Sequence, residues 1–332
     1  MSAFYDQEKW ILVSPCSKPR CGRFVTSIFF RELSHDGFEK QTELRLQTAN
    51  ERELAIAKLT ARSAFSKHWR LYVYEGVELA LFMISACICT VVLFHHGYAA
   101  MRMLPNAVLR RVLMGIAMGT TAVLIIHSPM GKSSGAHFNP AITLTYLRLR
   151  KIALCDAGFY VLFQFAGAVF GVGVSALALG KRLADPDVAY AVTIPGKYGA
   201  GVAFGAELFM AALLMGVVLF TSNRPRLARY TSYSVGILIA LYILLFAPVS
   251  GFSINPARTV GSAVFANIWT AGWVYFTAPL IGMMGAAEAY LRSYGPDRIL
   301  CAKLHPAPDY PCPFRCHVPS HRHSDISRNR ND

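Results

Sequence analysis

The chain has 332 residues, of which 54% are hydrophobic, with a mean hydropathy of +0.37 and a formal net charge of +14. This composition excludes an ordinary soluble domain, because long stretches nearly free of charge are typical of transmembrane helices of about 20 apolar residues each. The positive charge does not indicate a nucleic-acid partner, since Lys and Arg cluster in the polar segments outside those stretches.

Three regions follow one another along the chain. Residues 1–68 are polar and basic, with a helical, charged character over about 38–67, and residues 294–332 are rich in Pro, His and Cys. We expect the C-terminal region to be disordered. The predicted domains are therefore an extension over 1–68, a membrane domain over 69–293 and a tail over 294–332. The membrane domain contains six apolar spans: 71–95, 108–128, 154–180, 199–222, 230–248 and 270–293.

The basic residues predict how these spans are oriented. The N-terminal extension, the loop after the second span and the loop after the fourth span are all rich in Lys and Arg, and alternation of the spans places them on one face. Under the positive-inside rule, both termini are then cytoplasmic. No apolar segment of a secretory signal opens the chain, so we expect the first span to act as its own insertion signal.

One tripeptide occurs twice, as Asn139-Pro140-Ala141 and Asn255-Pro256-Ala257, 116 residues apart (139 to 255). Asn is a preferred helix N-cap, Pro is preferred at the first helical position, and Ala is the best helix former. Each copy follows a Gly-containing stretch and precedes a short apolar run. Because the run to Arg150 has room for only about 15 Å of helix, half a bilayer, we predict two re-entrant half-helices.

The membrane domain contains an internal repeat. Glu78-Leu79 in the first span corresponds to Glu207-Leu208 in the fourth, and each is followed by one of the tripeptides. Each half has three spans, an odd number, so the second half is inverted relative to the first. Inverted repeats place functional sites near the midplane, at broken helices. The predicted fold is an all-α membrane protein with six transmembrane helices and two re-entrant half-helices in an inverted repeat.

The facing half-helices predict a pore for neutral molecules. Two helix N-termini that meet carry partial positive charges, which repel cations. If Asn139 and Asn255 cap these helices with their side-chain oxygens, their NH₂ groups donate into the pore and orient water against proton relay. Backbone carbonyls of the two non-helical stretches would form a ladder of acceptors: Gly135, Ala136, His137, Phe138, Gly251, Ser253 and Ile254. An enzyme is not expected, because the spans lack a nucleophile–base pair, a nucleotide loop and a metal triad.

Three charged residues within the membrane domain complete this hypothesis. Arg258 lies one turn along the second half-helix, where it would donate hydrogen bonds to passing solutes and repel cations; the alternative is a side chain that extends to the membrane interface. Glu78 and Glu207 are expected to accept hydrogen bonds from the backbones of the two loops. A proton-relay role for these carboxylates is the alternative.

The segments Ser-Gly-Ala-His-Phe-Asn-Pro-Ala-Ile-Thr (134–143) and Gly-Phe-Ser-Ile-Asn-Pro-Ala-Arg (251–258) closely resemble the two signatures of the aquaporin, or major intrinsic protein, family. Gln164, Pro279 and Gly282 also fit that family. The resemblance covers about residues 70–293 and neither tail. It implies the hourglass fold, one pore in each protomer, a homotetramer, and a loop-supporting role for Gln164.

The resemblance also implies four selectivity-filter positions, of which the second-span residue stays open between two neighbours. These positions are Met118 or Gly119, Ile243, Phe252 and Arg258. Strict water channels typically have His where this chain has Ile243. An aromatic residue at the position of Phe252 resembles glycerol facilitators.

Other positions resemble water channels instead: Thr259, Ala263 and the pair Tyr275-Phe276. We therefore predict a passive channel for water that also admits small neutral solutes such as ammonia, hydrogen peroxide or glycerol. A glycerol facilitator is the first alternative. A non-conducting scaffold or junction protein is the second, and the long charged extension is its only support.

The tails contain five Cys residues, and those near the C-terminus suggest one further hypothesis. Cys301, Cys312 and Cys316, next to His317, provide ligand types that bind Zn²⁺, although their spacing matches no standard finger. Thiols without metal are the alternative, and no other cofactor is expected. The expected partners are water, small neutral solutes, the lipid bilayer and further copies of the chain, in a multi-pass protein of the plasma or inner membrane.

Overall fold

The computed structural model describes residues 35–305, 310 and 312–314, and for residues 35–59 it describes the backbone alone. The chain forms two compact units, residues 1–55 and 56–332. The described part of the first unit is helical throughout. The second unit contains the membrane domain, and within the described residues every regular element is a helix.

Each of the six predicted spans coincides with a long helix. Five of these helices are long and apolar enough to cross a membrane, and the sixth, α11, has 23 residues but is not among the five. The bounds are α1 (His35–Phe94), α3 (Ala107–His127), α6 (Leu154–Leu179), α8 (Gly199–Ser222), α9 (Thr231–Ser250) and α11 (Gly272–Tyr294). The chain is therefore a multi-pass integral membrane protein with an all-α fold.

Two shorter helices begin directly after the repeated Asn, as α5 (Pro140–Arg148) and α10 (Pro256–Ala266). Pro occupies the first helical position in both, where its missing N–H costs nothing. The remaining short elements connect the long helices: α2 (Ala99–Met103), α4 (Pro129–Ser134), α7 (Lys181–Ala184), η1 (Ala189–Ala191), η2 (Ala228–Tyr230) and η3 (Pro296–Arg298).

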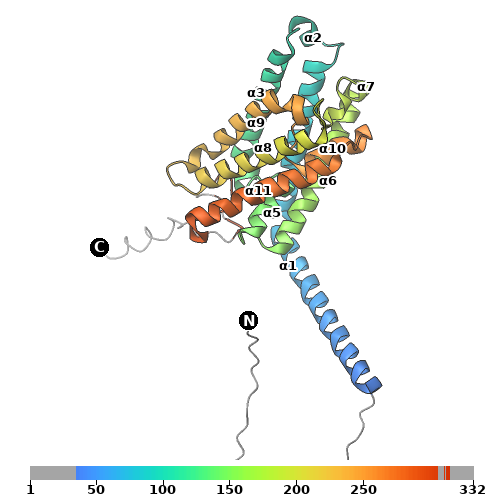
Figure 1. Ribbon diagram of the computed structural model, residues 1–332, viewed down its shortest axis with the longest axis vertical. Coiled ribbons are helices and arrows are strands. Elements are labelled where there is room, and N and C mark those ends of the chain that lie inside the picture. Colours follow the sequence, from blue (N-terminus) through green and yellow to red (C-terminus); the bar gives the residue numbers. More distant parts are fainter. Residues whose placement is uncertain (1–34, 306–309, 311, 315–332) are drawn as a thin grey trace, which may run out of the picture. The chain divides into compact units, whose positions relative to one another are not determined.

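The long helices pack in pairs, one within the second half of the chain and one between its two halves. Helix α8 lies along α11, and α3 lies along α9 (Figure 1). The half-helices pack across the repeat, since α5 contacts α11 and α10 contacts α6. Where α1 crosses α6, a Cβ at Gly167 would clash with the carbonyl of Gly76. Only glycine permits this close approach of the two backbones.

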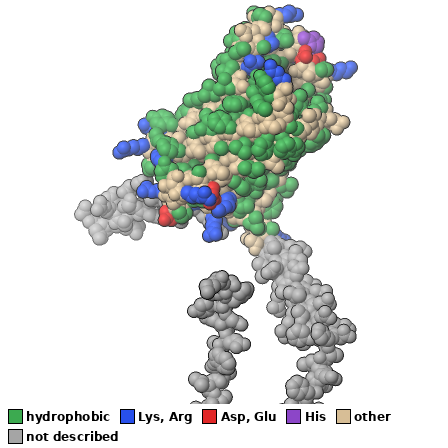
Figure 2. Space-filling model, in the orientation of Figure 1, with side chains coloured by type: hydrophobic (Ala, Val, Ile, Leu, Met, Phe, Trp, Pro, Cys, Tyr) green, Lys and Arg blue, Asp and Glu red, His purple; other side chains and the backbone are tan. Residues whose placement is uncertain are grey.

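The flanks of the second unit are apolar. Hydrophobic side chains cover the sides of the helices in Figure 2, whereas Lys and Arg gather near their ends. Some of the largest exposed hydrophobic side chains are Leu177 (89% exposed), Phe170 (66%) and Leu124 (65%). Such a large apolar surface is unfavourable in water but is suited to contact with lipid tails.

Two expectations for the regions outside the spans have different outcomes. The predicted helical character over 38–67 is confirmed, because α1 runs without interruption from His35. Disorder over the whole of 294–332 is wrong for its first part, since residues 299 and 301–304 are buried against the helices. Their backbone hydrogen bonds, described below, keep this stretch in place. The predicted domain boundaries at 69 and 293 stay predictions.

Candidate pore and its constriction

The two repeated Asn residues are N-caps with the same geometry. Both have extended backbones, and each side-chain oxygen accepts a hydrogen bond from the first turn of its half-helix. The Oδ1 of Asn139 accepts from the N–H of Ala141 at 2.9 Å, and the Oδ1 of Asn255 accepts from Ala257 at 3.1 Å and Arg258 at 3.2 Å. This leaves both amide nitrogens as donors.

These amides link the two halves of the chain reciprocally. The Nδ2 of Asn139 donates to the carbonyl of Ile254, and the Nδ2 of Asn255 donates to the carbonyl of Phe138, both at 2.8 Å. Each carbonyl belongs to the residue directly before the opposite Asn. Since an NH₂ group has two hydrogens, one on each side chain is committed to the opposite loop and one is left for a solute.

The loops that lead into the half-helices repeat their backbone conformation at an offset of 116 residues. Gly135 and Gly251 have φ of +105° and +76°. The next repeated positions also have positive φ, although they are not glycine: Ala136, Phe138, Phe252 and Ile254. Such conformations are strained for residues with a Cβ and persist only where surrounding contacts fix them.

Two buried carboxylates supply those contacts. Glu75 accepts hydrogen bonds from the N–H groups of His137 at 2.9 Å and Phe138 at 2.6 Å. Glu207 does the same for Ser253 at 2.9 Å and Ile254 at 2.5 Å. In each loop, a pair of consecutive N–H groups therefore meets one carboxylate, which satisfies donors that would be costly to bury alone.

In the structure, the loop-supporting role predicted for Glu78 is shared between Glu75 and Glu78. Glu78 accepts from the Ser134 hydroxyl at 2.8 Å, and its Oε2 has no hydrogen-bond partner within the described part of the chain. The N–H groups of the first loop bind Glu75, which sequence reasoning missed. Gln164 lies beside it and donates to Glu75 at 2.8 Å and to the Thr143 hydroxyl at 3.0 Å.

Two tyrosines that sequence reasoning did not single out as loop contacts hold the loops from the other side. Tyr160 donates to the carbonyl of Ser134 at 2.7 Å, and Tyr275 donates to the carbonyl of Ser250 at 2.6 Å. Ser134 and Ser250 are again 116 residues apart. Tyr275 was noted only for its resemblance to an aromatic pair of water channels.

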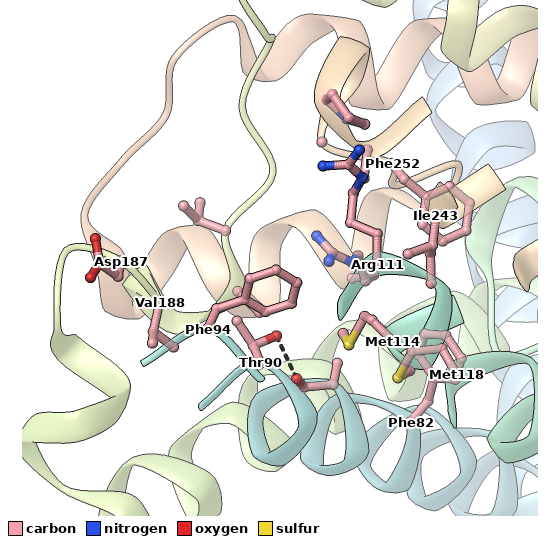
Figure 3. A pocket seen from close by; sticks show the side chains of 17 residues that line it. Phe82, Thr90, Phe94, Arg111, Met114, Met118, Asp187, Val188, Ile243 and Phe252 are labelled. Atoms are coloured by element: carbon pink, nitrogen blue, oxygen red, sulfur yellow. Dashed lines mark hydrogen bonds between the residues drawn. The ribbon is translucent and has the colours of Figure 1, made fainter. Parts of the chain in front are cut away.

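The predicted filter residues line one cavity of about 360 Å³. Met118, Ile243 and Phe252 lie close together in Figure 3, and Asp187 lies toward the opposite side of the view. Arg258 also lines this cavity. Of the two second-span alternatives, Met118 faces the cavity, whereas Gly119 packs against the backbone of α9 at Gly236. We call this space the vestibule, and the end of the helix bundle at which it lies the vestibule face.

A second, smaller cavity of about 40 Å³ surrounds the two Asn residues. Phe252 and Arg258 line both cavities, so they lie between them. The smaller space holds a few water molecules at most. Its lining includes four of the seven residues predicted to form the carbonyl ladder: His137, Phe138, Ser253 and Ile254. We call it the central cavity. Gly251 lines the vestibule, while Gly135 and Ala136 are not among the lining residues of either space.

Arg258 is the charged group at the junction of these cavities. Its side chain is about one helical turn from the Asn255 cap, and its Nη1 has no hydrogen-bond partner among the described residues. A buried guanidinium with an unused donor can bind a passing oxygen atom. Arg111 adds a second positive charge to the vestibule (Figure 3). Both charges oppose the entry of cations.

The groups that resemble metal ligands do not form a convincing site. His95, His96 and Asp185 lie close together at the vestibule face. However, His95 Nδ1 accepts from the N–H of Gly97 at 2.9 Å, so Nε2 carries the hydrogen and faces Asp185 at 3.8 Å. In the tail, the sulfurs of Cys301 and Cys312 are 3.5 Å apart. Cys316 lies outside the described residues, so the zinc hypothesis stays a prediction.

The fold and the constriction define a membrane protein built on an inverted repeat with a polar path between two half-helices. The family model of the major intrinsic proteins matches residues 62–290, and the chain belongs to that family. The resemblance seen in the sequence is thereby confirmed.

Three similar proteins illustrate the range of this family. A probable aquaporin of NIP type from Nicotiana alata is 32% identical over 170 residues, which are 51% of this chain and 61% of that protein. A glycerol uptake facilitator protein-like 6 from Lactiplantibacillus plantarum is 35% identical over 182 residues, 52% of this chain and 81% of that protein. The X-ray structure of the aquaglyceroporin from Plasmodium falciparum has a TM-score of 0.56 at 19% identity, covering 70% of this chain and 98% of that one, which shows the shared fold.

Proposed function

We propose that this chain is a passive transmembrane channel for water and other small neutral solutes. The observation that carries the proposal is the pair of reciprocal hydrogen bonds between Asn139 and Asn255 and the opposite loops. It leaves one amide hydrogen of each Asn beside a cavity large enough for a few waters. Solutes that exchange hydrogen bonds one at a time pass such a site without any chemical step, so no catalytic activity is proposed.

The same geometry supports the exclusion of ions and protons. The N-termini of α5 and α10 both point their partial positive charges toward the constriction. Arg258 adds a full charge within one helical turn. A water that accepts hydrogen bonds from both Asn amides has its oxygen fixed toward them, and this orientation interrupts a proton wire.

The filter residues determine what passes besides water. Met118, Ile243 and Phe252 give the vestibule side of the constriction apolar walls, with Arg258 as its charged member. Apolar walls bind carbon chains better than a polar filter does, which favours glycerol as a second permeant. One relative is named a glycerol uptake facilitator-like protein, and this favours the same reading.

The remaining parts of the proposal concern assembly and placement. We propose a homotetramer with one pore in each protomer, both termini in the cytoplasm, and no resident cofactor. The face at which α3, α8 and residues 299–305 end would then be cytoplasmic, and the vestibule would open to the outside. The regions before residue 69 and after residue 293 would be accessory to the channel domain.

Stopped-flow light scattering of proteoliposomes tests this function. We expect vesicles with the chain, or with its Leu304→Ala variant, to shrink faster under a sucrose gradient than protein-free vesicles. Leu304 is included because it forms one wall of the central cavity. Ile243→Trp, which fills the vestibule, should abolish the flux, whereas Leu177→Trp on the exposed flank should not. The proposal would be refuted if vesicles with the full chain and vesicles with Leu304→Ala both shrank no faster than empty vesicles.

A further inference from the structure

A stretch of chain after the last long helix is buried although it lies beyond the family match, which ends at residue 290. Ile299 is 1% exposed, Cys301 4%, Ala302 0%, Lys303 2% and Leu304 1%. These residues form no helix, so their burial comes from contacts with the rest of the second unit. We call residues 299–305 the closing segment.

The closing segment is hydrogen-bonded to the first re-entrant loop. The N–H of Leu304 donates to the carbonyl of Gly135 at 3.1 Å, and the ring Nε2 of His137 lies 2.8 Å from the carbonyl of Ala302. Since the carbonyl can only accept, Nε2 carries the ring hydrogen. His137 Nδ1 then accepts from the Thr143 hydroxyl at 3.1 Å, the same hydroxyl that accepts from Gln164. Gln164, Thr143 and His137 therefore each donate to the next member of a chain of hydrogen bonds that ends at the carbonyl of Ala302 in the closing segment.

Leu304 occupies a position at which it meets the permeation path. It lines the central cavity together with Asn139, Asn255 and His137. The carbonyl of Gly135, predicted to be an acceptor of the polar ladder, is instead bonded to the N–H of Leu304. The segment thus occupies a carbonyl that the sequence predicted for the ladder and adds an apolar side chain beside the constriction.

Three further hydrogen bonds hold the segment in this place. The ammonium group of Lys303 donates to the carbonyls of Lys132 at 2.7 Å and Tyr310 at 3.2 Å. Lys132 is in the last turn of α4, where the helix dipole favours a cation. The N–H of Leu300 donates to the side chain of Asn223 at 2.7 Å, directly after α8.

An aromatic ring covers the loop from the same side. The ring of Phe314 stacks on that of His137, with centroids 5.6 Å apart and planes within 6°. A Cβ at Gly135 would lie 2.9 Å from the Phe314 ring, so the ring rests against the loop backbone. The contacts of Lys303 and Phe314 are separate from those of Leu304 with the cavity.

We propose that the closing segment, residues 299–305, is an autoinhibitory plug, in which Leu304 obstructs the pore and Lys303, together with the ring of Phe314, holds it there. The channel conducts when the closing segment withdraws from the carbonyl of Gly135 and the ring of His137. This inference rests on the proposed channel function. It assigns the obstruction and the latch to different residues, which makes them separable by mutation.

Water permeability per protein of the full chain and three single variants tests the plug. Leu304→Ala removes the obstruction, and Lys303→Ala removes the latch without touching the cavity wall. Lys303→Ala should raise permeability about tenfold, the change in an equilibrium constant that the loss of one hydrogen bond to a charged group produces. Leu304→Ala should also raise permeability, because it shortens the side chain beside the constriction while its backbone hydrogen bond to Gly135 remains. The control is Arg298→Ala, an exposed position directly before the segment, which should match the full chain.

Thiol labelling provides a readout that does not depend on flux. In the full chain, Cys301 is buried and Cys312 is exposed. After reduction and treatment with a metal chelator, so that both sulfurs are available as thiols, we expect a maleimide to modify Cys301 about tenfold more slowly, as judged by peptide mass spectrometry. In Lys303→Ala the two rates should converge, and in Arg298→Ala they should not.

The outcomes separate this inference from the function on which it rests. Equal and substantial water flux in the full chain, Leu304→Ala and Lys303→Ala would overturn the plug and leave the channel intact. No flux in any variant, with Cys301 still protected in the folded full chain, would overturn the channel function and the plug with it. Higher flux in the two variants, together with faster labelling of Cys301 in Lys303→Ala, supports the plug.

Discussion

The loop-anchoring carboxylates allow one prediction to be worked through in detail, the replacement of Glu75 by Gln. The Oε1 of Glu75 accepts from His137, and its Oε2 accepts from Phe138 and Gln164. All three partners are N–H donors, so the site fits a group with acceptors only. A glutamine that keeps its oxygen at the Oε2 position retains two of the three bonds and turns an NH₂ group toward the N–H of His137.

The expected loss follows from this arrangement. One hydrogen bond to a charged group disappears, and a buried N–H faces another donor, which together cost about 2–4 kcal/mol. For a chain of this size, we expect the melting temperature to fall by about 5–15 °C. The inverted repeat predicts the same result for Glu207→Gln. The glutamine has only one oxygen, so its NH₂ group would face the N–H of either Ser253 or Ile254.

Two matched variants make the test selective. Glu78 is also fully buried, but it accepts its hydrogen bond from the Ser134 hydroxyl, which can donate or accept. We therefore expect Glu78→Gln to cost less than about 1 kcal/mol, because the hydroxyl can bond to either end of the amide. Glu288 forms an exposed ion pair with Arg148 at 3.0 Å, and Glu288→Gln should also cost no more than about 1 kcal/mol. Thermal unfolding in detergent, followed by tryptophan fluorescence, ranks the four variants. The reasoning is refuted if Glu75→Gln is no less stable than Glu78→Gln.

Three further predictions concern selectivity and pH. Asn255→Asp replaces the donor to the opposite loop by a negative charge, so we expect a sodium leak that ion-sensitive dyes in vesicles detect; a sodium-tight variant would contradict the proposed ion barrier. Ile243→His adds a polar ring to the vestibule and should lower the glycerol-to-water permeability ratio about tenfold, as re-swelling rates measure; an unchanged ratio would exclude this position from the filter. Burial, His127 and Lys132 lower the pKa of His305 in the closing segment below its ordinary value of 6.5, so the docked segment binds fewer protons than the released one. Docking should therefore weaken, and water flux rise, as pH falls below about 6.5, and His305→Gln should abolish this rise.

The sequence was sufficient to predict the parts of the fold that depend on local patterns. The apolar runs located all six long helices to within a few residues, except where α1 extends further toward the N-terminus. The two Asn-Pro-Ala copies predicted α5 and α10, because cap, first-turn proline and alanine each act within one helical turn. The inverted repeat predicted that the two caps correspond, and the offset of 116 residues holds through both loops.

The choice between Glu75 and Glu78 shows where local patterns stop being informative. These residues are three apart in one helix and therefore lie on nearly the same face, so periodicity does not distinguish them. The Glu-Leu pair favoured Glu78 by its likeness to Glu207-Leu208. The contact that decides between them depends on the height at which the loop meets α1, which is a property of tertiary packing.

The closing segment was missed for a different reason. Residues 299–305 have no helical or strand period, and their neighbours rich in Pro, His and Cys are typical of disorder. What holds them are hydrogen bonds of their own main chain. The N–H of Leu304 donates to the carbonyl of Gly135, and the carbonyl of Ala302 accepts from the ring of His137, so neither bond depends on side-chain identity within the segment. Composition carries no information about such contacts.

The reciprocal bonds of the two Asn side chains also set an order of events during synthesis. When the first half of the chain has entered the membrane, the amide of Asn139 and the carbonyl of Phe138 still lack their partners, which lie 115 and 117 residues further on. At ordinary elongation rates of about 5–20 residues per second, this interval lasts roughly 6–23 s. During that time, water or the insertion machinery must supply the hydrogen bonds that these two groups lack. The first half-helix reaches its final position only when the second half arrives.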